Sequence, residues 1–147
     1  MASAASIPPM SGPNLRRGLA YGIAMGLPFA AAWAVASAVL DLGAGLLVVA
    51  AIAGWLLGTA VALGAEPGTM RRRRATTSLA VGLGLATWLA AVIGAYLLGL
   101  AILPGSTLPF LERLANAPFL ESTAEQFLPL GPIELAVVAV CGWLGAR

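Results

Sequence analysis

Few side chains in this 147-residue chain belong to types that do chemistry. There is no histidine and no lysine, and the single cysteine is Cys141. A metal site, a haem held by imidazole, a Ser-His-Asp triad and a lysine Schiff base each lack a necessary group. Cys141 lies in an apolar run, where a small buried thiol is the simplest interpretation. We therefore expect no enzyme, no metal and no cofactor.

Glu134, in the sequence Gly131-Pro132-Ile133-Glu134, is the only carboxylate whose position in a predicted span would allow it to be embedded in the membrane. Ionisable groups inside a bilayer are costly and often mark ion or proton pathways. The same four residues resemble a helix start, where proline suits the first turn and a carboxylate complements the helix dipole. The sequence favours the helix start at the membrane interface, and a proton or ion site at Glu134 is the alternative.

All eight basic residues are arginine, and six acids leave a formal charge of +2. Four of the arginines form one block, which is either a topology signal or a contact for anionic lipid headgroups. No aromatic residues interleave with the basic ones, so we expect no nucleic-acid partner. The block consists of Arg71, Arg72, Arg73 and Arg74.

Hydrophobic residues make up 60% of the chain and charged residues 10%, with a mean hydropathy of +0.94. Soluble domains have roughly a quarter of charged residues, so a membrane protein is indicated. Residues 1–15 have no charged side chain and predict a flexible cytoplasmic tail. Residues 16–147 predict one all-α transmembrane bundle. Its four spans are 18–40, 46–64, 75–103 and 130–146, of which the last is the shortest.

Two features of these spans leave alternatives open. Arg16 and Arg17 with the apolar run after them also resemble a signal peptide, although that run is long for one. An offset of 60 aligns the first span with the third. An offset of 88 aligns Gly54-Trp55-Leu56 with Gly142-Trp143-Leu144, so the chain is either a parallel duplication of one hairpin or a bundle without a repeat.

The segment 104–129 has a different composition from the spans, with three of the six acids and three of the four phenylalanines. Apolar residues recur at helical spacing on both sides of Pro118. This pattern predicts two short amphipathic helices between the third and fourth spans, either on the membrane surface or packed over the mouth of the bundle.

The charges predict the orientation of the chain. With the amino terminus inside, seven of the eight arginines lie on the cytoplasmic side, and Arg113 lies outside with Asp41, Glu112, Glu121 and Glu125. This is a strong positive-inside bias. We expect a bacterial inner-membrane protein with both termini in the cytoplasm.

Small residues recur every four positions in the first three spans. Such residues let helix backbones approach closely, which matters in lipid because apolar side chains gain little by leaving equally apolar tails. The repeat predicts helix packing, either within the chain or with another subunit. The residues expected to pack are Gly18, Gly22, Gly26, Gly54, Gly58, Gly82 and Ala86.

These observations predict a small structural or accessory subunit that packs against the lipid bilayer and against other membrane subunits or a second copy of itself. The alternative is a small oligomeric transporter or channel that uses Glu134 or the segment 104–129. Four-helix multidrug exporters use a carboxylate deep in the first helix, and the first span here has none.

Overall fold

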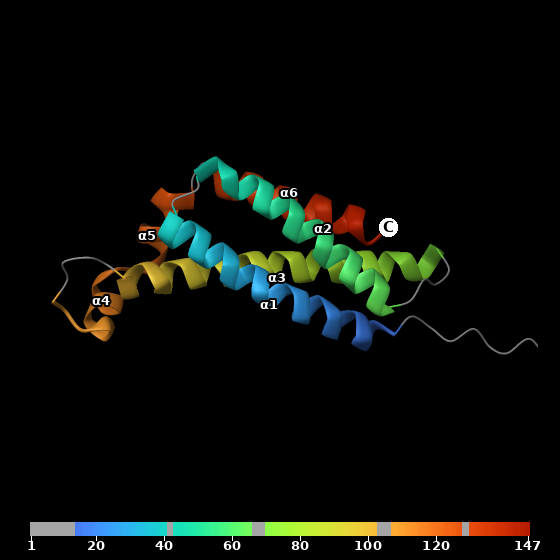
Figure 1. Cartoon of the computed structure of the whole chain (residues 1–147), viewed down its shortest axis with the longest axis horizontal. Helices are drawn as coiled ribbons and strands as arrows, with labels where there is room; N and C mark the ends of the chain where they lie inside the picture. The colour runs from blue at the N-terminus through green and yellow to red at the C-terminus, as the bar shows by residue number, and fades with distance from the viewer. Residues whose placement is uncertain (1–13, 41–42, 66–69, 103–106, 128–129) are drawn as a thin grey trace, which may run out of the picture.

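A computed structural model describes residues 14–40, 43–65, 70–102, 107–127 and 130–147 (Figure 1). The regular elements in these ranges are all helices, as predicted. Residues 1–13 of the predicted tail 1–15 lie outside the described residues, as does Asp41, whereas Asn14 and Leu15 lie at the start of the first helix. The elements are α1 (Leu15–Leu40), the short 3-10 helix η1 (Gly43–Gly45), α2 (Leu46–Ala65), α3 (Met70–Ile102), α4 (Phe110–Asn116), α5 (Phe119–Phe127) and α6 (Leu130–Gly145).

Three helices are long and apolar enough to cross a membrane: α1, α2 and residues Arg73–Ile102 of α3. Their outer faces are apolar as well as their inner ones, since Leu27, Val48 and Leu63 are each more than 60% exposed. Helices that are hydrophobic all round are typical of membrane spans. The protein is therefore a membrane-embedded helical protein. The fourth apolar helix, α6, has 16 residues and a length of about 24 Å.

Two helices begin earlier than the sequence predicted. Helix α1 begins at Leu15 instead of residue 18, and Asn14 caps it, because the Asn14 side-chain oxygen accepts a hydrogen bond from the Arg17 amide at 3.1 Å. Helix α3 begins at Met70, so the arginine block belongs to the helix and not to a loop. Arginine is a good helix former, and its long side chain reaches water from a helix that passes through the interface.

Helices α2 and α3 contact each other at the centre of the bundle, and α1 and α6 each pack against both of them. Helices α2 and α6 lie side by side and cross the layer of α1 and α3 (Figure 1). The pairs that the sequence offsets align, α1 with α3 and α2 with α6, are thus pairs in contact. Trp33, Leu57 and Val61 are the largest side chains buried almost completely.

Helix backbones approach closely where glycines face one another. A Cβ atom placed on Gly64 of α2 would lie 2.8 Å from the Cα atom of Gly18 on α1. One placed on Gly54 would lie 2.7 Å from the Val138 carbonyl oxygen on α6. Cβ atoms essentially never approach other atoms this closely, so these helices can meet at this distance only through glycine.

The contact between α2 and α6 gives a first prediction. A methyl group on Gly58 would collide with the backbone carbonyl of Gly142, whereas one on Gly99 of α3 would meet nothing within 4 Å. Gly58→Ala should lower the free energy of unfolding by about 1–3 kcal/mol, the usual cost of overpacking. Gly99→Ala is the matched control and should be neutral or slightly stabilising, because alanine favours helix. Unfolding in mixed detergent micelles measures both, and equal stability of the two variants would contradict the close contact.

Candidate functional site

Glu134 is the most deeply buried carboxylate among the described residues, with 2% of its surface exposed. It is the fifth residue of α6, beyond the first turn, and shares the inward face of the helix with Gly131, Val138 and Gly142. The helix does start close to Gly131-Pro132, as the sequence indicated. The structure does not place Glu134 in the first turn, and its side chain is buried in the bundle.

Trp88 of α3 provides the hydrogen bond to this carboxyl group. The indole Nε1–H donates to Glu134 Oε2 at 3.4 Å, at the long end of the hydrogen-bond range. Val138 belongs to an apolar cluster that also contains Trp33 and Ala91, and Trp88 packs against this cluster. The carboxyl group therefore lies beside an apolar core and joins α6 to α3.

This arrangement permits two protonation states. An indole N–H is only a donor, and both a carboxylate and a neutral carboxylic acid have an oxygen that accepts from it. A charged carboxylate in such an apolar setting is expensive unless it is paired. The site is thus able to hold one proton, and in its neutral form it acts as a polar link between two helices.

Five of the residues expected to pack lie at helix contacts. Gly18, Gly54 and Gly58 are the positions described above. A Cβ atom on Gly22 would meet the side chains of Leu83 on α3 and Val61 on α2. One on Gly26 would lie 2.6 Å from the Thr87 hydroxyl oxygen on α3.

The structure does not bring Gly82 and Ala86 into these contacts. Both are exposed, and a Cβ atom on Gly82 would meet nothing within 4 Å. A repeat of four drifts by about 40° per step on a helix of 3.6 residues per turn. The stripe of small residues on α3 consists of Ser78, Gly82, Ala86, Ala90 and Gly94. It therefore passes across the outer surface and reaches α1 only at Gly94, where a Cβ atom would lie 3.1 Å from that of Ala34. Ala80, Gly84 and Ala91 face the bundle instead.

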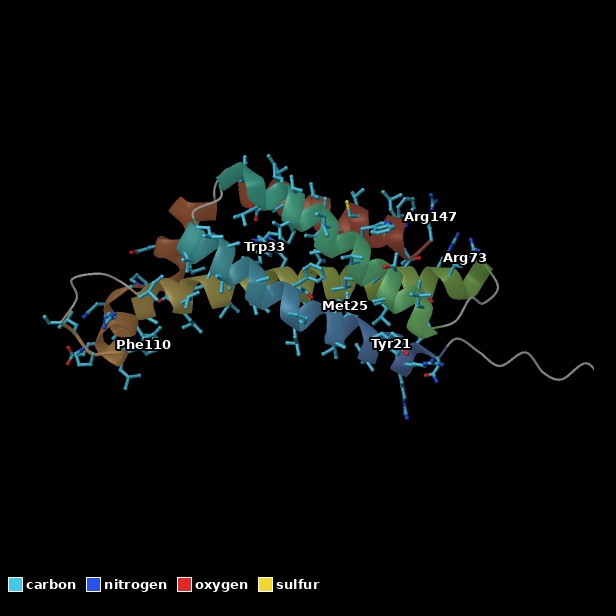
Figure 2. The ribbon with its side chains drawn as sticks, in the orientation of Figure 1. Tyr21, Met25, Trp33, Arg73, Phe110 and Arg147 are labelled. Atoms are coloured by element: carbon cyan, nitrogen blue, oxygen red, sulfur yellow. The ribbon has the colours of Figure 1, made fainter. Side chains whose placement is uncertain are left out.

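Helices α4 and α5 gather at the end of α3 that lies opposite the arginine block (Figures 1 and 2). Arg113 of α4 donates from Nη1 to the Leu100 carbonyl at 2.8 Å and from Nε to the Leu108 carbonyl at 2.7 Å. It thus satisfies a carbonyl in the last turn of α3, where a cation also complements the helix dipole. The Tyr96 hydroxyl donates to the Ala117 carbonyl, and its ring meets that of Phe119 edge to face, with centroids 5.0 Å apart.

The arginine block lies in the first turns of α3. The backbone of Arg71 and Arg72 is helical, and the side chains of Arg73 and Arg74 are exposed. Arg147 at the end of α6 lies at the same end of the bundle as Arg73 (Figure 2). Its guanidinium carbon lies 3.7 Å from the centroid of the Trp143 ring.

Sequence reasoning missed several residues that make these contacts. Trp88 is one of them, because nothing in its spacing from Glu134, 46 positions away, signals a hydrogen bond. Gly64 and Gly145 also lie at close backbone contacts. Gly64 does not belong to the four-residue pattern of Gly54 and Gly58, because it lies about 80° from Gly54 on the helical wheel. It contacts α1, whereas Gly54 and Gly58 contact α6.

Comparison with protein-family models, with curated proteins and with solved structures gives no match. Among the described residues, no three Cys, Asp or Glu side chains come together in a way that could hold a metal ion.

The docking of α4 on α3 gives a second prediction. Tyr96→Phe removes the hydroxyl that binds the Ala117 carbonyl and keeps the ring that contacts Phe119. Loss of one hydrogen bond costs about 1 kcal/mol, so amide exchange in residues 110–116 should accelerate about fivefold. Tyr21→Phe, at the other tyrosine, is the control and should leave this exchange unchanged. Unchanged exchange in Tyr96→Phe would show that the hydroxyl does not hold α4.

Proposed function

We propose that this protein is a small non-catalytic subunit of a larger membrane assembly. Its partner packs against an outer face formed by small residues of α1 and α3. The observation that carries the proposal is that the chain has more small-residue surface on its spans than its own helix contacts use. The exposed small residues in question are Ala20, Ala24 and Ala31 on α1, and Ala86 and Ala90 on α3.

These residues belong to one side of the bundle. Helices α1 and α3 are in contact, and the stripe through Ala86 and Ala90 rotates toward α1, which it meets at Gly94. On α1, the spacing of Ala20, Ala24 and Ala31 is i, i+4 and i+11, which keeps them on one face. A face of alanines allows a partner helix to approach closely, and lipid tails gain nothing comparable from it.

A pair of variants tests this third prediction. Ala90→Phe places a large side chain in the proposed face. The control Leu63→Phe places the same side chain outside that face, on α2, where Leu63 is 73% exposed. The wild-type protein, purified from its native membrane in mild detergent, should carry a stoichiometric membrane partner, quantified by mass spectrometry. Ala90→Phe should lose most of that partner and Leu63→Phe should keep it. Wild-type protein recovered without a partner, as a monomer, would refute the proposal.

The proposed orientation has both termini in the cytoplasm of a bacterial cell and α6 as a fourth span. Seven arginines at one end of the helices support it, against Arg113 at the other end. Helix α6 is short, and its last residue is followed by Ala146 and Arg147, so the span would rely on Trp143 and Arg147 at the interface. Helices α4 and α5 would then lie on the outer side.

The burial of Glu134 favours a second candidate, a small transporter or channel in which this carboxyl group carries a proton. Ionisable residues within spans often serve this purpose. Under the subunit proposal, the carboxyl group instead joins α6 to α3 through Trp88, and a neutral amide would do the same.

Glu134→Gln separates the two candidates and is the fourth prediction. The glutamine oxygen still accepts from the Trp88 indole, so we expect unchanged partner recovery and unchanged proton flux in vesicles that contain a pH-sensitive dye. Thermal stability should be equal or higher, because a buried carboxylate charge is removed. Glu121→Gln, on exposed α5, is the control. If Glu134→Gln abolishes a proton flux that the wild type and Glu121→Gln show, the transporter proposal is correct and the subunit proposal is wrong.

A further inference from the structure

An open groove runs between α3 and α6 at the end of the bundle that carries the arginines, with a volume of about 1080 Å³. Its mouth is lined by three arginines, Arg73 and Arg74 from α3 and Arg147 from α6. Figure 2 shows Arg73 and Arg147 at this same end. Among the described residues that line the groove, none has a carboxylate side chain. The mouth is therefore positively charged.

The chemistry of the groove changes along α3. From Arg74 the lining passes through the exposed hydroxyl of Ser78 to Val81 and then Leu85. These four residues follow the spacing i, i+4, i+7 and i+11, so they share one face of the helix. They cover about 16 Å along the axis, close to half of a hydrocarbon core that is roughly 30 Å thick. Along α3, the charged mouth is thus followed by a hydroxyl group and then by an apolar floor, over a distance close to the thickness of one membrane leaflet.

The guanidinium of Arg147 stacks on an aromatic ring at the mouth. It lies over the ring of Trp143, which also lines the groove, at 3.7 Å from the centroid. Stacking on the ring leaves the N–H groups at the edge of the guanidinium available. Such edges bind phosphate oxygens in pairs, which a lysine ammonium cannot do.

Gly82 leaves room on the apolar floor. It lines the groove, and a Cβ atom there would meet nothing within 4 Å. The space beside α3 at this depth is therefore open and apolar, with Val81 and Leu85 on either side of it in sequence. A soluble anion would leave this part of the groove unused, whereas an acyl chain fits its chemistry.

We propose that the groove binds one anionic phospholipid. The phosphate lies between Arg73, Arg74 and Arg147, within reach of Ser78, and one acyl chain follows the floor past Gly82. The arginines distinguish an anionic headgroup from a zwitterionic one, since each cationic side chain near the surface adds about 1 kcal/mol of attraction for anionic lipid, or roughly fivefold in affinity.

The test uses the full chain in mild detergent, titrated with phosphatidylglycerol or phosphatidylethanolamine of identical acyl chains and analysed by native mass spectrometry. The wild type should retain one phosphatidylglycerol and should not retain phosphatidylethanolamine under the same conditions. The double variant Arg73→Gln/Arg147→Gln should weaken phosphatidylglycerol binding about 25-fold, from two losses of roughly fivefold. The control Arg16→Gln removes an exposed arginine from the same end of the molecule and should change binding less than twofold.

The floor of the groove is tested separately from its charge. Gly82→Phe should displace the lipid, and Gly99→Phe, which enters equally open space elsewhere on α3, should not. If Gly82→Phe lowers the melting temperature, the smaller Gly82→Leu takes its place. Millimolar inorganic phosphate should fail to displace the lipid, because it gains nothing from the floor.

Three results would overturn the proposal. Equal retention of both lipids would remove the headgroup selectivity. An equal loss of phosphatidylglycerol affinity in Arg16→Gln and in the double variant would show that binding depends only on general surface charge. Displacement by inorganic phosphate, with Gly82→Phe unchanged, would make the groove a site for a soluble anion.

Discussion

Helices that are surrounded by lipid gain little free energy from burying apolar side chains, since the lipid tails are equally apolar. The bundle must be held by contacts that lipid cannot make, and in this protein those are close approaches between backbones. Where α2 meets α6 and where α1 meets α2, a Cβ atom on the facing glycines would lie within 3 Å of the neighbouring backbone. Dispersion attraction falls quickly with distance, so one methyl group at such a contact separates many atom pairs.

The same constraint explains the few polar contacts of the structure. Three of the side-chain hydrogen bonds join separate elements. Glu134 and Trp88 link α6 to α3 inside the bundle, and Arg113 and Tyr96 attach α4 and α5 to the end of α3. In an apolar setting an unsatisfied polar group is costly, so these bonds also fix which faces meet. The short helices therefore belong to the end of the bundle and not to the lipid surface alone.

The charge distribution distinguishes two surfaces, for which we propose two different neighbours. The groove with Arg73 and Arg147 offers cations beside an apolar floor, which suits an anionic lipid. The alanine face has no charged side chain from Ala20 to Ala31 on α1 or from Ala86 to Ala90 on α3, and it suits another helix. Because Gly82 borders the first surface and Ala86 the second, one drifting stripe on α3 serves both.

The helical architecture could be predicted from the sequence, because long uncharged runs are local signals. The contacts of Gly18, Gly22 and Gly26 on α1 could also be predicted, because a spacing of four residues stays close to one face of a helix over two turns. The positions of Gly82 and Ala86 could not be predicted from the sequence. Which side of α3 faces the bundle depends on the neighbouring helices, and the composition of α3 alone does not contain this information. The partnership of Glu134 with Trp88 is similarly a product of packing, since the two residues are 46 positions apart.

The close approach of α2 and α6 is tested most directly by a single substitution that uses the one native cysteine. A Cβ atom on Gly54 would lie 3.2 Å from that of Cys141, and disulfides span about 3.5–4.5 Å between Cβ atoms. A Cβ atom on Gly54 would also lie 2.7 Å from the Val138 carbonyl oxygen, so Gly54→Cys must move α2 and α6 apart by about half an ångström. At that separation it should form an intramolecular disulfide with Cys141 on mild oxidation in lipid vesicles, seen as a loss of two protons by mass spectrometry. Gly99→Cys, placed in open space, should not form one. A Gly54→Cys protein that stays reduced, or that forms only dimers, would contradict the packing on which the rest of the structure depends.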